Sequence, residues 1–343
     1  MQQSEVWLSA AADLVFDARS AVASRHSGWE RYSRSLRSAL HDQFRVVDYV
    51  GPRWRGEPIL PAANVVQPSI VVRGHAGTPV HYPTFPPPPA VSLALGRRLV
   101  YTLHDLTWWK YPETASRLGR AVYRKWAETA VRCTTILTVS EAVAREVQSS
   151  FGVPADRLFV ASLASDLPIC EPGRRPARDR PYLLSVAAIE PRKNIDRLVE
   201  AFRISGLAES HDLVLVGRRA WGEMPAGTSL LSDVDDDMLA GLYAGASATV
   251  LVSLYEGFGL PILESLAQGT TVVCSDLDVF REVSDGAGIF VDPLDPASIA
   301  RGLRAAAAGG SPPTSAVLAA RARSWADTAR QAGAAYASAR RNG

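Results

Sequence analysis

The chain has 343 residues, of which 47% are hydrophobic and 21% are charged, and its formal net charge is +2. At roughly 100–200 residues per domain, this length predicts two domains or one large domain, and the apolar content with near-neutral charge excludes intrinsic disorder. The small net charge also argues against a dedicated nucleic-acid-binding protein, so no nucleic-acid partner is expected.

The cysteines and the apolar stretches bear on the cellular compartment. Cys133, Cys170 and Cys274 are widely spaced and form no CxxC or Cys/His group, which is typical of reduced thiols rather than of a metal site. The first residues lack the basic and apolar layout of a signal peptide, and no stretch reaches the roughly 18 apolar residues that a membrane-spanning helix needs. A cytoplasmic location is therefore expected.

Short apolar runs alternate with longer helical patterns in the first half of the chain, which is typical of an α/β protein with parallel sheets. Residues 83–89 contain five prolines and predict an extended loop. The ranges expected to form strands are 14–16, 46–49, 70–72, 99–103, 135–139 and 158–160, and those expected to form helices are 30–41, 116–132 and 141–151.

The second half repeats this alternation after residues 171–181, a segment rich in Pro and Arg that predicts an interdomain linker. Two such series predict two Rossmann-like domains facing a cleft, over 1–172 and 173–325, with ligands at the carboxyl ends of the strands. The Ala-rich tail from about 317 to 341 has helical periodicity. The further strands expected are 182–187, 213–216, 248–252, 271–274 and 288–290, and the further helices are 194–205, 236–245 and 261–267.

The sharpest motif is the segment EGFGLPILE, residues 256–264, which directly follows a predicted strand. Its two glycines permit a tight turn, and its proline suits the first turn of a helix. Glu256 is then expected at the carboxyl end of the strand and Glu264 about one turn into the helix. The two carboxylates can bind different parts of one long ligand through its hydroxyls, or they can be solvated side chains of an ordinary strand–turn–helix unit.

A second motif carries two cations at the start of a predicted helix. Arg192 and Lys193 precede the helix expected over 194–205, although the dipole at a helix start favours anions. A bound diphosphate would bridge these cations and the positive helix end; the alternative is a solvated Arg–Lys pair. A third candidate, His104, follows the strand expected over 99–103, where a histidine is either structural or a ligand contact.

These motifs resemble those of the retaining glycosyltransferases of family 4, which have the GT-B fold. The resemblance covers about residues 14–335 in the same order. It is carried by YEGFGLP followed by ESLA, by EPRKN, by HDL with a following YP, and by GWERY. It implies an N-terminal acceptor domain, a C-terminal donor domain, and a final helix over 326–343 that returns to the N-terminal domain.

The resemblance also implies that the matching residues bind a nucleotide-diphosphate sugar. Glu256 would contact hydroxyls of the hexose, and Glu264 would hold the ribose. Arg192 and Lys193 would bind the diphosphate, and His104 would contact the sugar near the reaction centre. The donor-binding residues expected in this way are Gly28, Arg192, Lys193, Val234, Glu256, Gly257, Phe258, Gly259 and Glu264. The residues expected to act in catalysis are His104, Arg192, Lys193 and Glu256.

The chain departs from the family pattern in the GWERY segment. Glu30 stands where the family usually has Gly, and this carboxylate can bind an acceptor hydroxyl or narrow the loop that approaches the donor phosphates. Ala164 and Ala187 replace common glycines, and both are small enough to be tolerated. Base recognition is expected from the loops around 217–222 and 232–234.

The chemistry implied is transfer of a hexosyl group to a hydroxyl with retention of the anomeric configuration. Same-face attack, with the departing phosphate accepting the acceptor's proton, needs no protein base, cofactor or metal. The HDL and EPRKN variants resemble those of bacterial mannosyl- and rhamnosyltransferases of polysaccharide assembly, so a GDP-mannose type of donor is favoured. The acceptor, whether a glycan, a lipid-linked group or a small molecule, is not indicated by the motifs.

Two other functions compete with this interpretation. A metal-dependent GT-A transferase uses an Asp-x-Asp motif, and such triplets occur at 233–235, 235–237 and 276–278, the first two within an acidic run typical of a helix start. A non-catalytic GT-B subunit that binds a partner or a polysaccharide would be expected to carry degenerate motifs. Here the motifs are complete, which favours an enzyme.

The helix expected over 116–132 combines five basic residues with aromatic and aliphatic ones. Such a helix can lie on an anionic membrane surface. It can equally pack its apolar side on the sheet and leave its charged side in solvent. A peripheral contact with the inner face of the membrane is therefore one of two expectations for this helix.

Overall fold

The computed structural model describes residues 12–22, 28–50, 53–54, 57–58, 77–111, 117–171, 173–176, 178–217 and 230–342. The chain divides into two compact units, one formed by residues 1–163 and 325–343 and the other by residues 164–324. The sequence analysis places these boundaries at 172–173 and 325–326. The strand expected over 70–72 lies outside the described residues.

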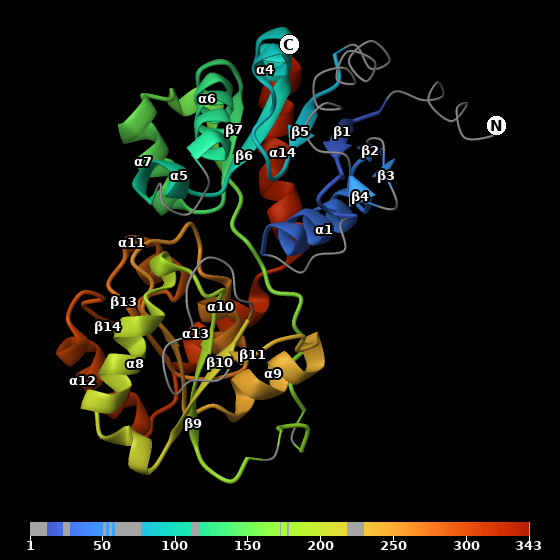
Figure 1. Cartoon of the computed structure of the whole chain (residues 1–343). Coiled ribbons are helices and arrows are strands. Elements are labelled where there is room, and N and C mark those ends of the chain that lie inside the picture. The colour runs from blue at the N-terminus through green and yellow to red at the C-terminus, as the bar shows by residue number, and fades with distance from the viewer. Residues whose placement is uncertain are drawn as a thin grey trace. The chain divides into compact units, whose positions relative to one another are not determined.

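The first unit is built on a parallel sheet in which all six strands run in the same direction (Figure 1). Its apolar runs become strands because helices cover both faces of such a sheet, so β1, β6 and β7 are buried along their whole length. The order across the sheet is β2 (Val46–Tyr49), β1 (Leu14–Asp17), β5 (Val80–Tyr82), β6 (Leu99–Leu103), β7 (Thr135–Thr138) and β8 (Leu158–Val160).

The helices of the first unit begin where local signals place them. Ser140 caps α7, its Oγ accepting a hydrogen bond of 3.2 Å from the Val143 amide. The proline-rich loop is shorter than expected, because Pro89 opens a helix, a position where its fixed φ is favourable. The helices are α1 (Gly28–His41), α4 (Pro89–Leu95), α5 (Thr107–Lys110), α6 (Arg117–Cys133), α7 (Glu141–Phe151) and α14 (Trp325–Arg341), and a separate hairpin joins β3 (Arg53–Trp54) to β4 (Glu57–Pro58).

The second unit also contains a six-stranded parallel sheet, with the strand order of a Rossmann fold. The order reverses between β9 and β12, so a crevice is expected at their carboxyl ends. The order across the sheet is β11 (Leu230–Leu231), β10 (Asp212–Val216), β9 (Tyr182–Val186), β12 (Ala248–Leu251), β13 (Val272–Ser275) and β14 (Ile289–Val291). The helices are α8 (Ile195–Ile204), α9 (Asp236–Gly245), α10 (Leu260–Ala267), α11 (Asp278–Val283), α12 (Pro296–Ala307) and α13 (Thr314–Ala322).

The Ala-rich tail has the helical structure that its periodicity predicts, and it forms two helices. Arg323 has extended backbone angles (φ −68°, ψ 129°) and ends α13, and α14 begins at Trp325. α13 packs against α10 of the second unit, whereas α14 packs against α1 and the strands of the first unit, where it is the red helix among blue and green elements (Figure 1). The return of the last helix to the first unit is therefore confirmed, as is the two-domain α/β fold.

Candidate functional site

The two cations and the first glutamate of the sequence motifs meet at the carboxyl ends of the central strands of the second sheet. Arg192 and Lys193 lie on a single 3₁₀ turn after β9, and Glu256 lies in the loop after β12. These strands are the pair at which the strand order reverses. Asn194, which has a left-handed backbone (φ 59°), ties the loops together by donating from Nδ2 to the carbonyl of Val252 at 3.0 Å.

Glu256 is the centre of a buried charge cluster. Its Oε1 accepts hydrogen bonds from Lys193 Nζ (2.5 Å) and Ser253 Oγ (2.8 Å), and its Oε2 accepts one from Arg192 Nη1 (2.8 Å). The Glu256 side chain is 9% exposed, and those of Arg192 and Lys193 are 12% and 17% exposed. The sequence did not predict these direct pairings, which join the residues of two separate motifs.

The cluster fixes the ionisation of Glu256. Burial alone raises the pKa of a carboxyl group, but the charges of Lys193 and Arg192, with the hydrogen bonds from Lys193 and Ser253, outweigh burial and lower the pKa of Glu256 to about 2. Glu256 is therefore a carboxylate at neutral pH. A carboxylate accepts hydrogen bonds and donates none, so it suits the binding of hydroxyl groups.

The two cations are engaged to different extents. Arg192 donates from Nη2 to Glu190 Oε1 (2.6 Å) and from Nη1 to the carbonyl of Tyr255 (2.8 Å), in addition to its bond with Glu256. The ammonium group of Lys193 forms an ion pair with Glu256. Lys193 has three donors on a flexible stem, so it can turn to an incoming anion at lower cost than the arginine.

Glu264 lies on α10, one turn from its start, as the motif predicts. It is 3% exposed, and its Oε2 accepts a hydrogen bond of 2.7 Å from the hydroxyl of Tyr243 on α9, which is fully buried. The role of Tyr243 is not predictable from the sequence, because a tyrosine in a helix carries no signal that it faces a carboxylate on another helix.

The geometry of the turn between these two glutamates requires the residue types found there. Gly259 has φ 101°, and a Cβ there would lie 2.7 Å from the Phe280 ring, so only glycine fits. Pro261 lies in the first turn of α10, as expected. Phe258 is 5% exposed, with the Arg323 guanidinium 5.8 Å from its ring centre. The turn that contains Gly257, Phe258 and Gly259 thus places its backbone between Glu256 and α10.

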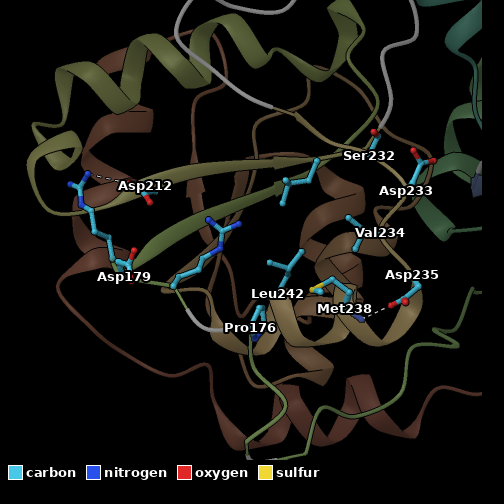
Figure 2. A pocket seen from close by; sticks show the side chains of 12 residues that line it. Pro176, Asp179, Asp212, Ser232, Asp233, Val234, Asp235, Met238 and Leu242 are labelled. Atoms are coloured by element: carbon cyan, nitrogen blue, oxygen red, sulfur yellow. Dashed lines mark hydrogen bonds and ion pairs between the residues drawn. The ribbon is translucent and has the colours of Figure 1, made fainter.

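Val234 lines a pocket of about 680 Å³ in the same unit, shown in Figure 2. The pocket lies beside β10, β11 and α9, with Met238 and Leu242 of α9 along one side (Figure 2). Val234 also packs against the apolar cluster that contains Tyr243, so α9 connects this pocket to Glu264. The rest of the expected base-recognition region, residues 218–222, lies outside the described residues.

The acidic run that opens α9 has a structural role. Asp235 is its N-cap, accepting a hydrogen bond of 2.8 Å from the Met238 amide. Across the described ranges, no group of three or more His, Cys, Asp or Glu side chains is placed to hold a metal ion. No helix in the described part of the chain is both long enough and apolar enough to cross a membrane.

His104 and Gly28 lie in the first unit, and the structure connects them through Trp29. The Trp29 ring stacks on His104 at 6.0 Å with an interplanar angle of 25°, and Tyr32 meets His104 edge-on at 4.6 Å. Gly28 is exposed at the start of α1. The role of Trp29 is not predictable from the motif, since its contact with His104 joins residues far apart in the chain.

The protonation of His104 follows from its surroundings. Burial is the main cause that lowers its pKa, partly offset by the Pro83 carbonyl and by Asp105. Nε2 lies 2.8 Å from that carbonyl, which can only accept, so Nε2 carries the hydrogen. The neutral ring then presents Nδ1 as an acceptor for a hydroxyl group.

A buried polar chain lies behind His104. His81 Nε2 lies 2.8 Å from Thr102 Oγ1, which is 3.0 Å from the Tyr32 hydroxyl, and His81 Nδ1 lies 2.9 Å from the Tyr336 hydroxyl on α14. Burial is the main cause that lowers the pKa of His81 to about 3, so it is neutral. The C-terminal helix therefore supports the element that carries His104.

Two family models match the chain. Residues 172–325 match the model described as "Glycosyl transferases group 1", and residues 66–167 match the model described as "Glycosyltransferase Family 4". The first match covers the part of the chain that contains both glutamates and both cations. The second match includes His104.

Individual relatives agree with these models. "O-antigen chain mannosyltransferase B" of Escherichia coli is 33% identical over 58% of this chain and 58% of its own length, and "O-antigen chain mannosyltransferase RfbU" of Salmonella typhimurium is 28% identical over 60% and 59%. The chain thus matches less than two thirds of the length of these relatives. The solved structure of Anabaena Alr3699/HepE in complex with UDP and glucose has a TM-score of 0.65 at 15% identity, over 94% of this chain and 98% of that one, which shows a common fold.

Proposed function

This chain belongs to the GT-B glycosyltransferases, and we propose that it transfers a hexosyl group from a nucleotide-diphosphate sugar to a hydroxyl acceptor with retention of configuration. The observation that carries the proposal is the Glu256 cluster at the carboxyl ends of β9 and β12. There, one buried carboxylate holds two cations, of which Lys193 can turn to a diphosphate while Arg192 adds its charge. A donor substrate supplies hydroxyls that can donate hydrogen bonds to the carboxylate and phosphates that can bind the cations.

Donor binding exchanges partners within the cluster. Lys193 turns from Glu256 to the diphosphate, because its single ion pair is the easier one to replace, while Arg192 stays on Glu190 and Glu256 and adds its charge. Glu256 compensates for the loss of Lys193 by accepting hydrogen bonds from hexose hydroxyls. Glu264, held by Tyr243, accepts hydrogen bonds from the ribose.

Catalysis then depends on stabilising the charge of the leaving group. Lys193 and Arg192 stabilise the nucleoside diphosphate as it departs, a preorganised electrostatic effect that can supply several kcal/mol. The departing phosphate accepts the proton of the attacking hydroxyl on the same face, so no protein base and no metal take part. His104 Nδ1 accepts a hydrogen bond from a hydroxyl of the sugar and orients that sugar.

The donor proposed is of the GDP-mannose type. Both relatives named above are called mannosyltransferases, and the EPRKN and HDL segments support the same choice. A non-catalytic subunit that binds a partner or a polysaccharide is the alternative, and it would bind an acceptor without transfer from any nucleotide sugar. Turnover that persists in EDTA would support metal independence.

The experiment that tests the proposal is calorimetric titration with GDP, GDP-mannose, UDP and UDP-glucose. Lys193→Ala and Glu264→Ala are each expected to weaken binding about tenfold or more, because each removes a charge-assisted hydrogen bond. Lys110→Ala is the matched control, because that lysine pairs with Glu146 on the first unit. Unchanged nucleotide binding in both site variants would refute the assignment of the site.

A contact with anionic membrane is proposed for α6. The apolar side of this helix packs on the sheet, which is the second of the two expectations for it: Tyr123, Ala127 and Val131 are buried. Val122, which is 40% exposed, and Lys125 nevertheless leave an apolar and a basic side chain in solvent. This pairing supports a weak electrostatic contact with a membrane surface rather than insertion.

A further inference from the structure

The carboxyl edge of the first sheet carries an aromatic corner that the proposed donor site does not use. The corner is formed by Trp29, in the first turn of α1, and Phe85, in the loop after β5. Their rings meet edge to face, with centres 5.9 Å apart and planes at 88°. Phe85 is 43% exposed and Trp29 is half-buried.

The position of this corner is that of a ligand site. The strand order of the first sheet reverses at β1. Trp29 follows β1 in the chain, Phe85 follows the adjacent β5, and His104 follows β6, which lies beside β5. Ligands of open parallel sheets bind at that edge. The Trp29 ring also stacks on His104, so a group bound in the corner lies beside the side chain proposed at the reaction centre.

The local sequence restricts the backbone that carries the exposed Phe85 ring. Prolines precede and follow it at positions 83, 86, 87 and 88, and each fixes its own φ near −65°. The Trp29 ring meets the Phe85 ring edge to face. A segment that is already restricted loses less conformational entropy when a ligand covers its side chain, which favours binding.

We infer that the Trp29–Phe85 corner is the acceptor site and that it takes a pyranose ring, stacked through its C–H face. The inference rests on the proposed function, in which the donor is held by the second unit and the first unit is left for the acceptor. A pyranose has an apolar C–H face and a rim of hydroxyls. The exposed Phe85 ring beside Trp29 matches the apolar face, and the hydroxyl rim is left at the polar edge of the sheet.

The alternative occupants differ in shape. A lipid tail requires a larger apolar surface than two rings provide, and a glycerol phosphate has no flat apolar face to stack. The structure therefore favours a sugar acceptor, and the other acceptors become outcomes of the test.

The test uses the full chain with methyl α-D-mannopyranoside and methyl β-D-galactopyranoside as probes, and with myo-inositol and glycerol 3-phosphate for comparison. Saturation-transfer NMR measures which probe protons lie on aromatic rings, and GDP release from GDP-mannose measures acceptor use. Saturation is expected on the C–H protons of one face of a pyranoside. Phe85→Ala is expected to raise the half-saturating concentration of that pyranoside about tenfold, whereas Phe85→Tyr is expected to restore it.

Trp29→Leu removes the second ring of the corner and tests its part in pyranoside binding separately. Leu93→Ala is the control, because Leu93 is 67% exposed on α4 of the same unit. Equal binding of a pyranoside by wild type and Phe85→Ala would overturn the inference, as would binding of no pyranoside or a preference for glycerol 3-phosphate. Intact nucleotide-sugar binding in these cases would leave the proposed function standing. A wild-type protein that binds no nucleotide-sugar donor would refute the proposed function itself.

Discussion

The buried Glu256 cluster predicts a specific dependence of stability on pH. The pKa of Glu256 is lowered from 4.5 to about 2 in the folded chain, so its contribution to stability is complete above about pH 4.5 and is lost as the pH falls towards 2. A shift of this size corresponds to about 3 kcal/mol. Roughly half of that, between 1 and 2 kcal/mol, is lost between about pH 6 and about pH 3.5.

The perturbation is Glu256→Gln, which removes the titrating group and leaves its shape. The assay is urea unfolding at about pH 6 and about pH 3.5, followed by circular dichroism. The variant is expected to be less stable than wild type at pH 6, because Lys193 and Arg192 lose their carboxylate, but to lose roughly 1 to 2 kcal/mol less on acidification.

A second variant separates the contribution of the Ser253 hydrogen bond to this pKa from that of the two cations. Ser253→Ala removes one hydrogen bond to Glu256 and neither cation, so its acid sensitivity is expected to stay close to that of wild type. The same loss of stability on acidification in wild type and Glu256→Gln would refute the buried ion cluster. A Ser253→Ala protein that behaves like Glu256→Gln would show that the cations are not what lowers this pKa.

Three further predictions concern the turn, the second glutamate and α6. Gly259→Ala is expected to lower the unfolding free energy by about 2–4 kcal/mol, because its Cβ meets a buried ring at a positive φ; an unfolding midpoint equal to wild type would contradict this geometry. Tyr243→Phe and Glu264→Gln are expected to show a coupling energy of about 1 kcal/mol or more in a double-mutant cycle of unfolding free energies. Additive effects on the unfolding free energy would mean that the two side chains do not interact. Wild type is expected to sediment with vesicles containing anionic lipid at low salt and not with neutral ones, and the double variant Arg124→Glu, Lys125→Glu is expected to remain in solution; wild type that stays in solution with both kinds of vesicle would refute the membrane proposal.

The motifs predicted much of the local structure around the site because each element has a short-range cause. Glu256 follows a strand and Glu264 lies one turn into a helix, since glycine and proline set the turn between them. Ser140 caps its helix by the same kind of local rule. The family resemblance then gave these positions their expected roles.

The elements that the sequence misjudged lack such local signals. β5 has only three residues and is short and mixed in polarity, yet it is buried in the sheet because β1 and β6 flank it. The start of the last helix, in contrast, is placed near residue 325 by the family resemblance and not by the helical periodicity, which continues on both sides of Arg323 and Ser324. Tertiary packing overrides local propensity at β5.

By itself, the sequence determined the α/β class, the positions of most strands and helices, and the residues that carry charge at the strand ends, because these depend on periodicity and on turn chemistry within a few residues. Only the tertiary structure decided that Glu256 pairs with Arg192 and Lys193, that Tyr243 holds Glu264, and that Trp29 lies between Phe85 and His104. Each of these contacts joins residues distant in the chain. Their distances, burial and ionisation depend on how the strands are ordered in the sheets, which no local pattern encodes.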